Sequence, residues 1–205
     1  MITKIPRGEL RWFQQWIERD EIVPPSTGAR QVVILHPGTR WVPDHQLPTA
    51  LPYANDPDDA RLSARQQLIL EEALHTVLDP RTVCHFALYA GFLNESDHGR
   101  SDGFNEPAAT WHSGRLNYVL FSGELRDSGF VGVEQRWGSG RTYIAGAPFP
   151  IVELSYLWTD DHTVMVASPP DTAATFVLGP GALAELILND SELDAREWSR
   201  GDSAG

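Results

Sequence analysis

Cysteine, basic residues and long apolar runs are all scarce in this sequence. The 205 residues include one cysteine, and 16 Lys and Arg stand against 28 Asp and Glu, for a formal net charge of −12 at pH 7. A single cysteine excludes a disulfide framework and is typical of a cytoplasmic protein. An acidic excess without a basic cluster makes nucleic acids and anionic membranes poor partners, and no apolar run approaches the roughly 18 residues of a membrane span. We therefore expect a soluble cytoplasmic protein, whose charge favours a basic protein as partner.

Local motifs for metal binding and catalysis are also lacking. The seven histidines show no helical zinc spacing such as H-E-x-x-H. The acidic run Asp56-Pro57-Asp58-Asp59 lacks the glycine and the distal glutamate of a calcium loop. Cys84 lies in the apolar run 83–89 and is expected to be buried, with His85 on the opposite face of a strand, so the two do not form a catalytic dyad. We expect no metal ion and no cofactor, and the pattern assigns no catalytic residue.

What the sequence does contain is enough apolar material for a large core. Hydrophobic residues make up 41% of the chain and include seven Trp, eight Phe and five Tyr. A chain of this length suits one domain, and a core of this size requires neither disulfides nor metals. We therefore expect residues 1–198 to form a single domain and the small, polar segment 199–205 to be a flexible tail.

Periodicity along the chain predicts three helices and six strands. Apolar residues recur at helical spacing in 9–19, 63–78 and 181–189, and Ser63 followed by Gln66 predicts a capping box. Apolar runs between turn residues predict strands at 31–36, 83–89, 116–121, 151–158, 163–167 and 173–178. Four of the six strands lie in the C-terminal half of the chain. This order indicates an α+β fold, with a single, mainly antiparallel β-sheet packed against about three helices.

One group of candidate binding residues surrounds the predicted hairpin at 158–171. Asp160 and Asp161 stand in its turn, Trp158 precedes them and Asp171 follows the next strand. Paired carboxylates suit general acid–base chemistry. Turns between strands also select Asp for its local hydrogen bonds, and both interpretations stay open.

A second group lies on predicted loops. The segment 39–60 has four prolines and no periodicity, and loops of such length are commonly functional. It contains the acidic residues Asp56, Asp58 and Asp59, while Trp111 and Trp137 are candidate aromatic anchors. Aromatic anchors inside a charged rim are typical of protein interfaces that associate tightly and fast.

Several short motifs stand in a fixed order along the chain, namely Gln31 to Pro37, His75 to Arg81, Phe86 to Phe92, Tyr118 to Gly123 and Leu157 to Asp161, followed by Asp171, Thr175 and Val177. This order resembles that of a family of uncharacterised cytosolic proteins of about this length from high-GC bacteria. The family favours Trp at the position of Tyr89, a second Trp at Thr159 and Arg at His162, and it has a glycine pair where this chain has Leu178-Gly179-Pro180. The resemblance implies a fold of the same kind and no established activity.

These features favour a non-enzymatic protein-binding module, of the immunity or antitoxin kind, that inhibits a basic partner. The alternative is a small-molecule-binding protein or an enzyme with a pocket near the 158–171 hairpin, and a structural subunit of a larger assembly is a third class. The candidate binding residues for these hypotheses are Asp56, Asp58, Asp59, Trp111, Trp137, Trp158, Asp160, Asp161 and Asp171.

Overall fold

The structure, a computed structural model, describes seven segments of the chain. They are residues 3–18, 29–37, 62–89, 109–113, 116–127, 154–168 and 174–198. These segments carry three α-helices and nine strands, and every strand pairing between them is antiparallel. The predicted α+β fold class, with antiparallel strands and three helices, is therefore confirmed.

The chain divides into two compact units, each built from segments far apart in the sequence. Unit 1 comprises Met1–Val23 and Pro80–Asp160, and unit 2 comprises Pro24–Asp79 and Asp161–Gly205. The expectation of a single cooperative domain over 1–198 stays a prediction, which an experiment in the Discussion tests.

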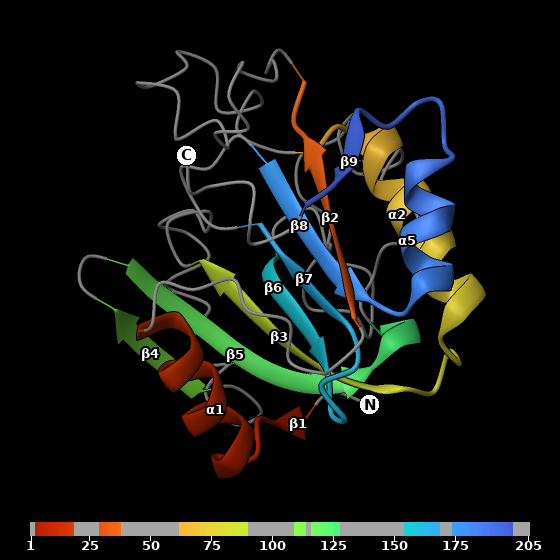
Figure 1. Cartoon of the computed structure of the whole chain (residues 1–205). Helices are drawn as coiled ribbons and strands as arrows, with labels where there is room; N and C mark the ends of the chain where they lie inside the picture. Colours follow the sequence, from red (N-terminus) through yellow and green to blue (C-terminus); the bar gives the residue numbers. More distant parts are fainter. Residues whose placement is uncertain are drawn as a thin grey trace, which may run out of the picture. The chain divides into compact units, whose positions relative to one another are not determined.

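The described residues of unit 1 form five antiparallel strands and one long helix. β5 pairs with β1, β4 and β3, and β3 pairs in turn with β6, so β3 lies in the middle of the sheet (Figure 1). A 3-10 turn follows β5, and the helix α1 lies beside the strands. The elements are β1 (Thr3–Lys4), α1 (Arg7–Glu18), β3 (Val83–Tyr89), β4 (Ala109–Ser113), β5 (Leu116–Glu124), the turn Leu125–Asp127 and β6 (Leu154–Thr159).

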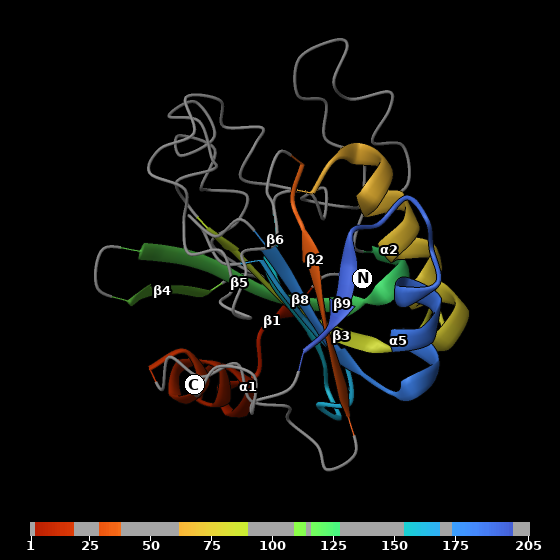
Figure 2. The same cartoon turned by 45° about the horizontal axis from the view of Figure 1, so that its top comes forward.

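In the part of unit 2 that the structure describes, four antiparallel strands follow one another in the order β7, β8, β2, β9, together with two helices. Figure 1 and Figure 2 both show α2 and α5 lying side by side next to these strands. The elements are β2 (Arg30–Leu35), α2 (Ala64–Val77), β7 (Met165–Ala167), β8 (Ala174–Gly179), α5 (Gly181–Leu188) and β9 (Ala195–Glu197).

The start of α2 in unit 2 is determined by two residues of its local sequence, Ser63 and Gln66. Ser63 Oγ accepts a hydrogen bond from the Gln66 amide, and the Gln66 side chain accepts one from the Ser63 amide. This reciprocal pair satisfies two amides that lack helical partners, as the sequence predicted. The Gln66 side chain also donates to the Leu35 carbonyl at 3.1 Å, which ties the first turn of α2 to the end of β2.

The predicted helices and strands are confirmed, with ends that differ by at most three residues. Cys84 is buried, as expected. The register pairs it with Gly123 and Thr159, whereas the next residue of the strand, His85, pairs with Ser122 and Trp158. Three strands were not predicted, namely β1, β4 and β9. β1 and β9 have two and three residues, too few for an alternating pattern to show.

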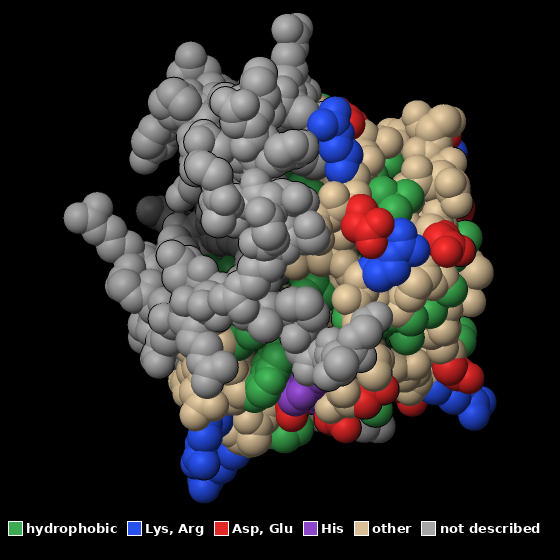
Figure 3. All heavy atoms as spheres, viewed as in Figure 1, with side chains coloured by type: hydrophobic (Ala, Val, Ile, Leu, Met, Phe, Trp, Pro, Cys, Tyr) green, Lys and Arg blue, Asp and Glu red, His purple; other side chains and the backbone are tan. Residues whose placement is uncertain are grey.

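Charged side chains of opposite sign lie next to one another on the face drawn in Figure 3. In unit 2, Arg30 pairs with Glu197 at 2.7 Å, and Arg65 pairs with Glu192 at 2.6 Å. No helix within the segments that the structure describes is long and apolar enough to cross a membrane. The predicted loop 39–60 and the tail 199–205 lie outside the described residues.

Candidate functional site

Three neighbouring strands of unit 1 place the side chains of Ser122, His85 and Trp158, each with a polar group, in one row across the sheet. His85 in β3 is directly opposite Ser122 in β5 and directly opposite Trp158 in β6. Residues that face each other across antiparallel strands point to the same face of the sheet. His85 Nδ1 lies 2.7 Å from Ser122 Oγ, and His85 and Trp158 are both fully buried. The imidazole is therefore held on one side by a hydroxyl group.

Asp160 approaches the other side of the imidazole from the end of β6. It stands two residues after Trp158, on the same face by strand alternation, and its amide donates to the Val83 carbonyl at 3.0 Å. Its Oδ1 lies 3.0 Å from His85 Nε2, yet the Asp160 side chain is 63% exposed while that of His85 is 0% exposed. Asp160 thus connects a fully buried ring nitrogen with the solvent.

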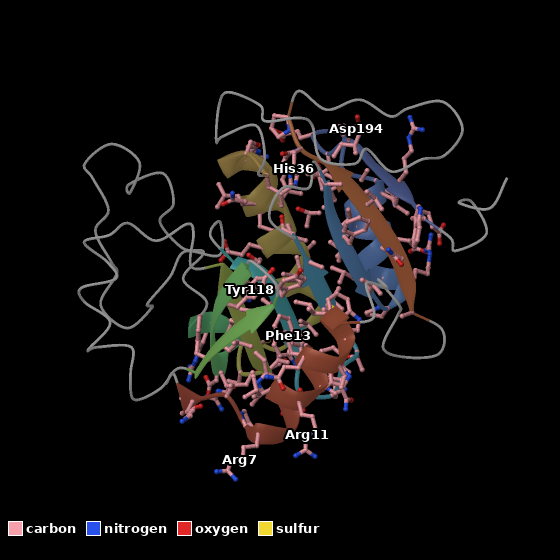
Figure 4. The ribbon with its side chains drawn as sticks, turned by 90° about the vertical axis from the view of Figure 1, so that its left-hand side faces the viewer. Arg7, Arg11, Phe13, His36, Tyr118 and Asp194 are labelled. Carbon is pink, nitrogen blue, oxygen red and sulfur yellow. The ribbon has the colours of Figure 1, made fainter. Side chains whose placement is uncertain are left out.

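The helix α1 adds a second carboxylate. Phe13 stacks flat on Trp158, with ring centroids 4.9 Å apart, and meets Tyr156 and Tyr118 edge-on at 5.2 and 6.0 Å. Figure 4 shows Phe13 turned toward the strand of Tyr118, while Arg7 and Arg11 point away from the strands. This aromatic contact sets the face of α1 that meets the sheet.

Glu9 lies one helical turn before Phe13 and therefore on the same face of α1. Its Oε2 accepts a hydrogen bond from Trp158 Nε1 at 3.0 Å and lies 3.8 Å from His85 Nε2. The Glu9 side chain is 16% exposed. We call Glu9, His85 and Asp160 the acid–imidazole cluster, since two carboxylate oxygens converge there on one ring nitrogen.

The cluster can hold a proton in more than one place. A neutral imidazole carries its proton on Nδ1 or on Nε2, and the hydrogen bond at the other nitrogen decides which. The Ser122 hydroxyl can donate to His85 Nδ1 or accept from it, so either form keeps the 2.7 Å contact. Ser122 itself is only 3% exposed. Although Ser122, His85 and Asp160 form a row, the hydroxyl is too deeply buried to act as a nucleophile on a substrate from solution.

The cluster is also a group that could hold a metal ion. Glu9, His85 and Asp160 each offer one ligand atom, and these three atoms all lie within 4.8 Å of one another. The sequence-based expectation that no metal binds rested on local spacing. His85 is 76 residues from Glu9 and 75 from Asp160 along the chain, so no spacing rule within one helix or loop applies to them.

A second buried histidine lies in unit 2. His36 Nε2 is 2.8 Å from Thr175 Oγ1, and Thr175 Oγ1 is 3.0 Å from Ser168 Oγ. His36 and Thr175 are both buried. The contact of Nε2 therefore joins the imidazole to hydroxyl groups, which bind cations less well than carboxylates do. The acid–imidazole cluster is therefore the stronger candidate site.

Unit 2 also contains a buried carboxylate, Glu71 on α2. Burial, together with the smaller effect of the nearby negative charge of Glu72, raises the pKa of Glu71 to about 7. Its Oε1 lies 3.7 Å from His75 Nε2, one helical turn away. A side chain that titrates near neutral pH makes the stability of unit 2 depend on pH.

The structure separates the candidate residues of the 158–171 hairpin. Trp158 and Asp160 meet at the acid–imidazole cluster, as described above. Asp161 instead serves the turn, because its Oδ1 accepts from the Thr163 amide at 3.0 Å and from the Thr163 hydroxyl at 2.8 Å. The turn interpretation therefore holds for Asp161, and a binding interpretation stays open for Asp160.

The other candidates are not placed at any site. Trp111 is a residue of β4, paired in register with Tyr118. Asp171, Trp137 and the acidic loop residues Asp56, Asp58 and Asp59 lie outside the described residues. Their proposed binding roles stay predictions.

Glu9, His85 and Ser122 were not among the predicted site residues. The sequence placed Glu9 in an amphipathic helix, His85 in a strand and Ser122 directly after the strand predicted at 116–121. Only the pairing of β3 with β5 and β6, and the stacking of α1 on Trp158, bring them together. The one available signal was a histidine inside the apolar run 83–89, where a buried polar side chain requires a partner.

Comparison of the chain with protein-family models, with curated proteins and with solved structures finds no match. The family resemblance noted from the short motifs therefore stays an expectation.

Proposed function

We propose that the protein binds a small ligand at the acid–imidazole cluster of unit 1. The observation that supports this most is the contact between a fully buried ring nitrogen, His85 Nε2, and the largely exposed carboxylate of Asp160, 3.0 Å away. A histidine that only stabilised the core would be satisfied by Ser122 and one buried partner. Here the contact reaches the surface, where a ligand can displace water from Asp160 and meet the imidazole behind it.

The chemistry of the cluster selects the class of ligand. Its two outer members, Glu9 and Asp160, are carboxylates, which accept hydrogen bonds but do not donate them when ionised. Two carboxylate oxygens around one imidazole nitrogen suit a positively charged ligand, either a metal cation or a small organic ammonium. An anionic ligand would meet two like charges and is disfavoured.

The proposal is tested by comparing two neighbouring aspartates. Thermal shift and isothermal titration of the full chain with a panel of divalent metal salts and small ammonium compounds would be run on the wild type, Asp160→Asn and Asp161→Asn. Both substitutions remove one negative charge at adjacent positions, but the carboxylate of Asp160 lies at His85, whereas that of Asp161 accepts from the Thr163 amide. We expect at least one member of the panel to bind the wild type and Asp161→Asn, and to bind Asp160→Asn at least about tenfold more weakly, a loss of about 1.4 kcal/mol.

Two outcomes contradict the proposal. Absence of binding to the wild type by every member of the panel is one, and equal binding to Asp160→Asn and Asp161→Asn is the other.

A cytoplasmic protein-binding module of the immunity or antitoxin kind is a second proposal, and the net charge of −12 supports it. A partner steered by charge would be basic, and its association would slow steeply with added salt. Replacing Asp56, Asp58 and Asp59 together by Asn separates this proposal from the first, because only a protein partner would associate more slowly.

A further inference from the structure

We propose that the ligand of the acid–imidazole cluster is a divalent transition-metal ion, coordinated by Glu9 Oε2, His85 Nε2 and Asp160 Oδ1. This inference rests on the proposed function and narrows it, since it names which kind of cation the cluster binds. The three residues come from α1, β3 and the end of β6, all within unit 1.

The distances fit one ion shared by the three atoms. Bonds from zinc to imidazole nitrogen and to carboxylate oxygen are about 2.0–2.2 Å. Two atoms bound to the same ion are then about 3.0 Å apart at a right angle and about 4.2 Å apart when they lie on opposite sides. His85 Nε2 is 3.0 Å from Asp160 Oδ1 and 3.8 Å from Glu9 Oε2. Both separations fall within these limits, and the three ligand atoms all lie within 4.8 Å of one another, so the two carboxylates need only small side-chain adjustments to share one ion with His85.

The ligand types indicate which ions the cluster prefers. One imidazole nitrogen with two carboxylate oxygens suits Zn²⁺, Mn²⁺, Fe²⁺ or Co²⁺. Ca²⁺ takes six to eight oxygen ligands, and Mg²⁺ is held mainly by oxygen and water. The fully buried His85 ring therefore favours a transition metal over the two alkaline-earth ions.

Each ligand is held in place by a further contact. Trp158 Nε1 donates to the same oxygen of Glu9 that faces His85, at 3.0 Å. The Asp160 amide is bound to the Val83 carbonyl. Ser122 Oγ lies 2.7 Å from His85 Nδ1 and can accept a hydrogen bond from the Nδ1–H group, which leaves the Nε2 lone pair for the metal. Outer contacts of this kind orient metal ligands and raise their affinity.

The cluster supplies three protein ligands and opens to solvent on one side. The Asp160 side chain is 63% exposed, whereas Glu9 and His85 are 16% and 0% exposed. Zinc sites with three protein ligands and an accessible fourth position bind water or substrate there, unlike closed structural sites with four protein ligands. The proposed site is therefore of the open kind, and a bound ion would present its remaining positions on the side of Asp160.

The test uses the full chain, freed of metal by dialysis against EDTA, and two probes. Co²⁺ is titrated while its visible absorption is recorded, because coordination by protein ligands changes the geometry around cobalt. Zn²⁺ binding is measured by isothermal titration. We expect one tight site per chain for each ion. Asp160→Asn is the chief variant, since an exposed residue is replaced with little risk to folding, and Asp161→Asn is its matched control.

The hydrogen bond between Ser122 and His85, which involves no metal ligand atom, gives an independent test of the site. Ser122→Ala keeps all three ligands but removes the hydroxyl that orients His85, and we expect it to weaken Zn²⁺ binding by about 10–100-fold. Asp160→Asn and Glu9→Gln remove a ligand charge and should weaken it at least as much. Circular dichroism of each variant checks that the fold is retained. Ser122→Thr keeps a hydroxyl on the same position and should restore most of the affinity.

The outcomes separate this inference from the proposed function. One site for Co²⁺ and Zn²⁺, lost in Asp160→Asn and retained in Asp161→Asn, supports both. Binding of an organic ammonium compound that Asp160→Asn abolishes, without a metal site, overturns the metal inference and supports the proposed function. Metal binding that Asp160→Asn and Glu9→Gln leave unchanged overturns the metal inference, because the ion would then bind elsewhere. Absence of any ligand at the cluster overturns both.

Discussion

Units 1 and 2 build their cores from different side chains. In unit 1, α1 packs through aromatic rings, with Phe13 stacked on Trp158 and in edge contact with Tyr118 and Tyr156. In unit 2, the buried positions of β2, α2 and α5 are mainly aliphatic. They include Val32, Val33, Ile34, Leu35, Leu70, Leu74, Leu183 and Ile187, each 1% exposed or less.

The two units also treat buried ionisable groups differently. In unit 1 the carboxylate of Glu9 accepts a hydrogen bond from the indole of Trp158, and His85 lies between Ser122 and Asp160. In unit 2 burial raises the pKa of Glu71 to about 7. Aromatic residues such as Trp offer a polar group at the edge of an apolar ring. In unit 1, the indole N–H of Trp158 therefore positions the carboxylate of Glu9 at the edge of the aromatic core.

The largest expected effect is the loss of the aromatic contact in unit 1. Phe13→Ala removes the ring that stacks on Trp158, and a buried Phe→Ala substitution lowers the free energy of unfolding by about 3–5 kcal/mol. Gln15→Ala is the control, since Gln15 is exposed on the same helix and should change stability by less than about 0.5 kcal/mol. Denaturant unfolding followed by circular dichroism measures both. A loss below about 1 kcal/mol for Phe13→Ala would contradict the role given to this ring.

The same variant tests the expected single domain. Hydrogen exchange resolves the protection of amides in β3 and β5 of unit 1 and in β2 and β8 of unit 2. If residues 1–198 unfold as one cooperative unit, the most protected amides of both units lose protection equally in Phe13→Ala. Loss confined to unit 1 would show that the two units unfold separately.

An intermediate effect is expected at Glu71, and it depends on pH. The folded-state pKa of about 7 is above the ordinary value of 4.5, so the folded protein binds this proton more tightly than the unfolded chain. Stability is therefore full below about pH 4.5 and falls as the pH rises toward 7. Glu71→Gln, which is always neutral, should be more stable than the wild type at pH 8, by up to about 3 kcal/mol, and equal to it at about pH 4.

Thermal melts across this pH range measure the difference, with Glu72→Gln as the control. Glu72 is the exposed neighbour of Glu71, and its removal should give a much smaller gain. A Glu71→Gln variant that is less stable than the wild type at pH 8 would show that the charged carboxylate, through His75 at 3.7 Å, stabilises unit 2 instead.

The smallest effect is expected at the surface of unit 2. Arg30 binds Glu197 through two hydrogen bonds of 2.7 and 2.9 Å, linking β2 to β9, but both side chains are partly exposed to water. The hydrogen bond from Arg30 holds the pKa of Glu197 below its ordinary value, so its stabilising contribution is lost as the pH falls. Glu197→Gln should lower the melting temperature slightly at low salt and not at about 1 M salt, where exposed charges are screened. A loss that persists at high salt would indicate a structural rather than an electrostatic role.

Much of the fold could be predicted because its signals are local. The capping box of Ser63 and Gln66, the apolar periodicity of α2 and the runs that became β2, β3 and β8 are each contained within a few neighbouring residues. Short strands without such a pattern, β1 and β9, were missed. The turn role of Asp161 was also foreseen, since an Asx hydrogen bond to Thr163 involves residues only two positions apart.

The candidate site was only partly predictable because its members are distant in the sequence. Trp158 and Asp160 were singled out for their place beside a predicted turn, without any sign of their partners. Glu9, His85 and Ser122 carry no shared motif. Their convergence depends on which strands pair, on the register of that pairing and on which face of α1 meets the sheet.

The sequence by itself determined the acidic charge, the fold class and the places where helices and strands form, because composition and periodicity act over short stretches of chain. The tertiary structure alone decided that His85 meets Ser122, Glu9 and Asp160. Strand register decides which side chains oppose one another, and a shift of one residue would have turned His85 to the other face of the sheet. The stacking of Phe13 on Trp158 then decided which carboxylate of α1 completes the cluster.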